Sequence, residues 1–125
     1  MSDDEDGTDF RLIDEISGVF QNFTAGEKVF ASEEEGDCMY VVRSGAVEIR
    51  YYGVVVDRIG PGGIFGEIAL IDGSTRSASA IAVEDAVLTP ITRDGFLTLV
   101  QRRPTFALDV MKALTRRIRG MNESM

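Results

Sequence analysis

The chain has 125 residues, of which 44% are hydrophobic, and its formal net charge at neutral pH is −8. This length suits one domain with a substantial core, and no apolar run approaches the roughly 20 residues of a membrane-spanning helix. The chain contains no histidine and a single cysteine, Cys38, which excludes Ser-His-Asp and Cys-His catalysis, imidazole metal sites, cysteine clusters and internal disulfides.

The N-terminal segment, residues 1–8, is acidic and unpatterned, which predicts a disordered tail before one domain at 9–125. An acidic start lacks the basic and then apolar order of a signal peptide, so we expect a cytoplasmic protein. From Asp9 to Val19 apolar residues recur at helical spacing. This pattern predicts an amphipathic helix with Thr8 or Asp9 as its N-cap.

Short β-branched and aromatic runs follow, separated by glycine at intervals of about eight to twelve residues, which is typical of an all-β barrel or sandwich. Tight turns are predicted at Ser44-Gly45 and Gly53. Pro90 is expected at an edge or an irregular position of its strand, because it donates no backbone hydrogen bond. The predicted strands are residues 19–24, 28–31, 38–44, 46–52, 54–59, 77–83 and 86–92.

Helical spacing returns after Arg93 and predicts one helix that ends near Arg103 and a second with Pro104 in its first turn. Residues 101–125 carry a net charge of +4 and residues 1–100 a net charge of −12. A body this acidic repels nucleic acid at long range. We therefore expect that the arginines of the last helix lie on a solvated face. A contact with an anionic ligand or partner is the second expectation for them.

One segment, residues 64–82, combines a Gly-Glu pair, a short apolar run and a single arginine. Gly66 and Glu67 before the apolar run predict a strand end followed by one turn of helix, whose first N–H groups favour an anion. A loop at 72–75 can bring Arg76 back towards them, so that Arg76 binds a phosphate and Glu67 a hydroxyl of one ligand. A simple surface ion pair between Arg76 and Glu67 is the alternative, and the commoner one for so short a motif.

Residues 65–82 read FGEIALIDGSTRSASAIA, a string that resembles the phosphate-binding cassette of the cyclic-nucleotide-binding domain family. The flanks GEKVFASEEEGDCMYVVRSGAVEI and IGPGGIFGE resemble the family's first strands and its glycine-rich approach to the cassette, so the resemblance runs from about Phe20 to Arg119. It implies a mainly β fold, an eight-stranded β-roll or jelly-roll barrel. An N-terminal helix, a short cassette helix and two C-terminal helices would flank the barrel.

The resemblance also implies roles for individual residues. Arg76 would bind the cyclic phosphate and Glu67 the ribose 2′-hydroxyl, while Ser77 and backbone N–H groups would bind phosphate and sugar. Thr75 stands where many family members have proline, which loosens the loop but removes no ligand contact. The candidate ligand-binding residues are Gly66, Glu67, Ile68, Ala69, Arg76 and Ser77. The candidates for a lid over the base are Arg116, Arg117 and Arg119, with Ile118 and Met121 as apolar alternatives.

The function that the resemblance implies is that of a stand-alone, non-enzymatic sensor of cAMP, or of cGMP, with no cofactor or metal. Its C-terminal helices would respond to the ligand and pass the signal to a protein partner or a second copy. An interaction domain that has lost its nucleotide is the first alternative, although Arg76 and Glu67 are both present. A cupin-like enzyme is disfavoured by the absence of histidine, and a DNA-binding fragment by the negative charge.

Overall fold

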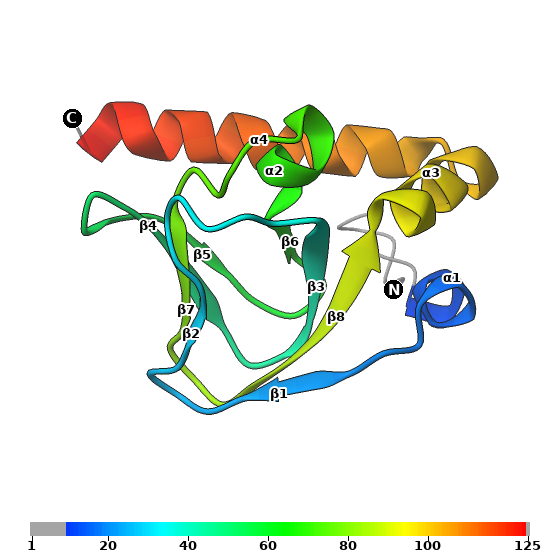
Figure 1. The fold of residues 1–125 in the computed structure, drawn as a ribbon, viewed down its shortest axis with the longest axis horizontal. Coiled ribbons are helices and arrows are strands. Elements are labelled where there is room, and N and C mark those ends of the chain that lie inside the picture. The colour runs from blue at the N-terminus through cyan, green and yellow to red at the C-terminus, as the bar shows by residue number, and fades with distance from the viewer. Residues whose placement is uncertain (1–9, 125) are drawn as a thin grey trace.

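The computed structural model describes residues 10–124, so the acidic segment 1–8 lies outside the described residues. Short strands form a β-roll with helices around it (Figure 1). The elements in chain order are α1 (Phe10–Ile16), β1 (Gln21–Phe23), β2 (Lys28–Phe30), β3 (Cys38–Ser44), β4 (Val47–Tyr51), β5 (Val54–Ile59), β6 (Ile64–Phe65), α2 (Glu67–Asp72), β7 (Ser79–Ala82), β8 (Ala86–Thr92), α3 (Arg93–Arg102) and α4 (Thr105–Ser124).

The strands form two antiparallel sheets, with the orders β1-β8-β3-β6 and β2-β7-β4-β5. Strands that are distant in sequence pair in both sheets, since β1 lies beside β8 and β2 beside β7. Figure 1 shows α4 running along one side of the roll, with α1 and α3 at one end. The mainly β fold class with flanking helices is therefore confirmed.

Alternate side chains of β3 divide the hydrophobic core into two parts. Met39 and Val41 face the helices and join a cluster with residues of α1, α3 and α4. Val42 faces the inside of the roll, where it packs with Phe65 and Leu88. Because successive residues of a strand point to opposite faces, one strand supports both the helical layer and the barrel interior.

The predicted strands 38–44, 54–59 and 86–92 agree with β3, β5 and β8. The first helix is shorter than the predicted 9–19: it ends at Ile16, and Gly18 with a φ of 68° turns the chain towards β1. Pro90 lies beyond Leu88, the last β8 residue paired with β1. Its carbonyl accepts a hydrogen bond of 2.9 Å from Ser17 Oγ, so the absent N–H costs no sheet hydrogen bond.

The last helix packs closely on the roll through Gly120. A Cβ atom at this position would overlap the backbone carbonyl of Val56 on β5. The glycine therefore lets α4 approach β5 backbone to backbone. Among the described helices, none is long and apolar enough to cross a membrane.

Candidate functional site

A sharp turn joins β6 to α2 and begins the cassette. Gly66 has a φ of 83°, a left-handed conformation that glycine adopts without strain. At the other end of α2, Gly73 has a φ of 72° and donates its N–H to the carbonyl of Ala69. Ser74 then donates from its N–H (2.9 Å) and its hydroxyl (2.6 Å) to Asp72 Oδ1, and these bonds lower the pKa of Asp72. The bonds shape the loop that leads to Arg76.

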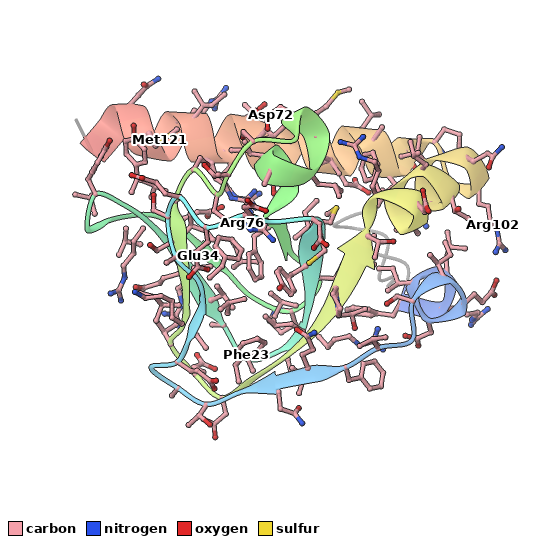
Figure 2. The ribbon with its side chains drawn as sticks, viewed as in Figure 1. Phe23, Glu34, Asp72, Arg76, Arg102 and Met121 are labelled. Carbon is pink, nitrogen blue, oxygen red and sulfur yellow. The ribbon has the colours of Figure 1, made fainter. Side chains whose placement is uncertain are left out.

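Arg76 is buried, with 4% of its surface exposed. Its Nη1 donates to the carbonyl of Gly66 (2.9 Å) and its Nη2 to the carbonyl of Cys38 (2.8 Å). The guanidinium lies 4.1 Å from the centre of the Phe30 ring, and Figure 2 shows Arg76 between α2 and the interior of the roll. The loop before β3 also holds its backbone, since Arg76 N donates to Glu34 O at 2.7 Å.

An aromatic cluster lies beneath this guanidinium. The ring centres of Tyr40 and Phe65 are 5.3 Å apart and stacked, and the ring of Phe30 tilts against both of them. Burial raises the pKa of Tyr40, and a hydrogen bond with the Cys38 side chain raises it further. Tyr40 is therefore a neutral phenol at physiological pH and leaves the charge of Arg76 uncompensated.

Glu67, at the start of α2, is also buried and has 1% of its surface exposed. Its Oε2 accepts a hydrogen bond from Nη1 of Arg117 on α4, while Nη2 of Arg117 donates to the carbonyl of Ile64. Arg117 Nε lies 3.3 Å from Asp57 Oδ2 on β5. A single arginine of α4 thus holds α2, β6 and β5, and the expectation that it lies on a solvated face was wrong for Arg117, which is 5% exposed.

The cassette side chains surround a cavity of about 30 Å³. All six candidate ligand-binding residues line it, and Arg117 is the lid candidate that reaches it. Phe30, Ile49 and Ala78 also line it, although the sequence analysis missed them. The alternation of β2 and β4 could have placed Phe30 and Ile49 inside the roll, but no local signal shows that they reach the cassette. The lining residues are Phe30, Ile49, Gly66, Glu67, Ile68, Ala69, Arg76, Ser77, Ala78 and Arg117.

The other lid candidates lie elsewhere in this conformation. Arg116 Nε is 3.1 Å from Asp57 Oδ2, and Arg116 and Arg119 line a hollow on the outer face of α4. Ile118 is 54% exposed. Met121 packs against the interior cluster of the roll, and Figure 2 shows it near the C-terminal end of α4.

Three buried side-chain atoms of the cavity-lining residues have no hydrogen-bond partner within residues 10–124: the donors Nε of Arg76 and Nε of Arg117, and the acceptor Oε1 of Glu67. Arg117 Nε still has an ion-pair partner in Asp57, whereas Arg76 Nε and Glu67 Oε1 have none in that range. A buried polar group without a partner is costly, so such atoms indicate a site for a ligand or water. Arg76 and Glu67 have separate partners and are both buried, which contradicts the alternative of a surface ion pair between them.

The arrangement fits a ligand that carries both an anion and a hydroxyl. A guanidinium has five N–H donors, and Arg76 uses only two of them on carbonyls.

A cavity of about 30 Å³ has room for about one or two waters. Small-molecule sites usually enclose roughly 300 Å³ or more, so a ligand of that size can enter only after side chains or α4 move. Among the described residues, no group of three or more acidic or cysteine side chains could hold a metal ion.

Over residues 20–103 the chain matches the family model described as Cyclic nucleotide-binding domain. The chain therefore belongs to the cyclic nucleotide-binding domain family, as the cassette motif predicted.

Individual relatives agree with this family. The chain is 37% identical over 102 residues to the Cyclic AMP receptor protein of Thermus thermophilus, covering 78% of this chain and 47% of that protein. It is 43% identical over 72 residues to the cAMP-dependent protein kinase regulatory subunit of Yarrowia lipolytica, covering 58% of this chain and 19% of that protein. The solved structure of the Thermus thermophilus Catabolite Activator Protein superposes with a TM-score of 0.73 at 33% identity, over 98% of this chain and 61% of that one. This chain thus spans less than half the length of the two relatives compared by sequence.

Proposed function

We propose that this chain is a non-catalytic sensor that binds a cyclic mononucleotide at the cassette. The observation that carries the proposal is the pair of unpartnered buried atoms, Arg76 Nε and Glu67 Oε1, on residues that line one cavity. A cyclic nucleotide supplies what this pair lacks, because its phosphate accepts hydrogen bonds and its 2′-hydroxyl donates one. Arg76 then binds the phosphate, Glu67 binds the ribose, and Ser77 with the backbone at 66–69 completes the contacts.

cAMP is the first ligand to test and cGMP the second. The names of two relatives in the family refer to cyclic AMP, as a receptor and as a kinase regulatory subunit. These names also favour a regulatory role over a catalytic one. The net charge of −12 over residues 1–100 disfavours direct contact of this body with nucleic acid.

The C-terminal helix is the part of the proposed sensor that responds to the ligand. Arg117 binds Oε2 of Glu67 and lines a cavity of about 30 Å³, which has no room for a nucleotide until Arg117 and α4 move away. Entry of the ligand therefore weakens a contact between α2 and α4. A ligand that favours the conformation without this contact shifts the position of α4.

The outer face of α4 is the surface that we assign to a second copy of the chain. Leu108, Met111 and Ile118 are each more than half exposed there, and Thr115 lies between them. Their spacing of three and four residues repeats over the helix like the seam of a two-helix coiled coil. Such a stripe is self-complementary, so a second α4 can cover it.

Calorimetric titration tests the binding site. The protein is stripped of nucleotide and titrated with cAMP and with cGMP, beside Arg76→Ala and the control Arg58→Ala. Arg58 is an exposed arginine that pairs with Glu84 and lies outside the cavity. We expect saturable binding to the wild type and to Arg58→Ala, and a loss of about 10- to 100-fold or more in Arg76→Ala, because charged hydrogen bonds are lost. An absence of heat with both nucleotides overturns the proposal and favours an interaction domain without nucleotide.

A further inference from the structure

A second hollow, of about 400 Å³, lies on the outer face of the β2-β7-β4-β5 sheet. Ser79 and Ile81 of β7 line it, while the alternate residues Ala80 and Ala82 are fully buried inside the roll. The register places Lys28 opposite Ile81 and Arg50 opposite Ser79, so both cationic side chains share this outer face. The hollow falls within the size range of small-molecule sites without any movement of the chain.

Tyr52 forms one wall of this hollow and is unusual for its place in the fold. It stands at the β4–β5 turn with a φ of 51° and is 88% exposed. Turns of this kind favour Asn, Asp or Gly, so the turn itself gives no reason for a tyrosine. Its ring packs edge-on against Tyr51, with the ring centres 4.6 Å apart. The two rings present an aromatic surface to the hollow, although this leaves apolar area exposed to water.

Cationic and hydroxyl groups lie beside this aromatic surface. Lys28 is exposed and forms no ion pair with any residue in the range 10–124. Arg50 donates to Glu48 from Nε and Nη2, and its Nη1 is left over for another acceptor. Ser79 Oγ accepts a hydrogen bond of 3.1 Å from Ser32 N, so its own proton is available to a ligand. Lys28, Arg50 and Ser79 thus offer donors for an anion, beside Glu33, which also lines the hollow, and with the charge of Arg50 paired with Glu48.

We propose that the hollow is a second binding site, for a flat aromatic ligand that carries an anionic group, such as a nucleoside monophosphate. The aromatic ring stacks on Tyr52, and the anion receives hydrogen bonds from Lys28, Arg50 and Ser79. Stacking on a tyrosine tolerates different bases, so this site selects for an aromatic anion more than for one base.

This site is separate from the cassette but shares a wall with it. Ser77 lines both the hollow and the cassette cavity, and it directly follows Arg76 in the chain. On the opposite rim, Glu33 donates its N–H to the carbonyl of Arg76 at 2.7 Å. A ligand in the hollow therefore touches the backbone that carries Arg76.

AMP is the probe, and the Arg76→Ala variant is the background, because this change is expected to weaken binding at the cassette. NMR titration of this variant follows the amide signals of residues 50–54 and 77–81. We expect saturable shifts there, and an AMP affinity about tenfold or more lower when Tyr52→Asn or Lys28→Gln is added, since a lost stacking contact has about this effect. Asparagine suits the turn at position 52, so Tyr52→Asn keeps the hairpin. The control is Val54→Thr, on the same hairpin but outside the hollow.

The proposal is overturned if AMP produces no saturable shifts in the Arg76→Ala protein. It is also overturned if Tyr52→Asn and Val54→Thr bind AMP equally well. Adenosine serves as the neutral comparison, and an affinity equal to that of AMP contradicts the anionic part of the proposal. None of these results depends on whether the wild-type cassette binds cAMP, so the two proposals succeed or fail separately.

Discussion

At the scale of single residues, the position of Arg76 depends on a neighbour without a side chain, Gly36. A Cβ atom at this position would overlap Arg76 Nε and Cζ. Since these atoms belong to a long side chain, Gly36→Ala displaces the guanidinium more easily than it disturbs the backbone. We expect the affinity for cyclic nucleotide to fall about tenfold or more, about 1.4 kcal/mol or more. The thermal midpoint should fall as well, because the displaced guanidinium loses its hydrogen bonds to the carbonyls of Gly66 and Cys38. Calorimetric titration and scanning calorimetry measure the two effects.

The matched control for this substitution is Gly60→Ala. A Cβ at Gly60 would meet nothing within 4 Å, and Gly60 does not have a positive φ. This variant should bind nucleotide like the wild type. Equal affinities for Gly36→Ala and Gly60→Ala would show that the displaced guanidinium is not a ligand contact.

The sequence motif predicted which residues meet at the cassette, but not what they contact. Gly66, Glu67 and Arg76 lie within eleven positions of one another, and local turn chemistry brings them together. Arg117 is 50 residues from Glu67 in the sequence. Helical spacing alone did not show that Arg117, and not Arg116, would reach the cavity. Only the packing of α4 against β5 and β6 decides that Arg117 points inwards, so no local pattern could identify it.

At the scale of the element, Arg117 is the latch of the proposed sensor: it holds α4 against α2 in the closed form. The Arg117 guanidinium contacts Glu67, the Ile64 carbonyl and Asp57. Arg117→Gln destabilises the closed form, because it leaves Glu67 buried without its cation. Asp57 keeps its ion pair with Arg116. We expect a lower thermal midpoint without ligand and tighter binding of cAMP. The gain is about tenfold if the closed form makes up about 90% of the molecules.

Arg116→Gln is the control for the latch, because Arg116 also pairs with Asp57 and yet does not line the cavity. Its nucleotide affinity should stay within about twofold of the wild type, because an exposed ion pair contributes little. If Arg117→Gln instead binds cAMP more weakly, while Arg116→Gln is unchanged, Arg117 is a lid that contacts the ligand. The same calorimetric titrations thus separate a latch from a lid.

The elements themselves differ in how well local sequence specifies them. β3, β5 and β8 carry runs of β-branched residues, and their predicted bounds agree with the structure. β6 has only two residues and was anticipated only as a strand end before Gly66, because so short a strand leaves no period to detect. The pairing of β1 with β8 joins residues more than sixty positions apart and depends on how the whole roll closes.

At the scale of the whole molecule, the acidic body and the basic outer face of α4 determine how two copies can meet. The apolar stripe of Leu108, Met111 and Ile118 is flanked by Lys112, Arg116 and Arg119, of which Arg116 is paired with Asp57. Two such faces repel each other through their flanks while their stripes attract. At 0.1 M salt, charges that are more than about 10 Å apart are largely screened from each other. Added salt therefore weakens this repulsion but not the attraction that comes from burying apolar surface. A dimer formed through α4 should therefore become tighter as salt is added, whereas a dimer held by ion pairs should become weaker.

Sedimentation equilibrium at low and high salt tests this arrangement. We expect the wild type to sediment at twice the monomer mass, with a dimer dissociation constant that falls as salt rises. Ile118→Glu places a charge within the apolar stripe and should leave monomers at both salt concentrations, while its cyclic nucleotide affinity is retained because Ile118 does not line the cavity. The control is Leu97→Glu, since Leu97 on α3 is 55% exposed and lies outside the stripe. Monomeric wild type at high salt, or a dimer that Ile118→Glu leaves intact, would show that α4 does not join two copies. The stripe would then remain available for a different protein.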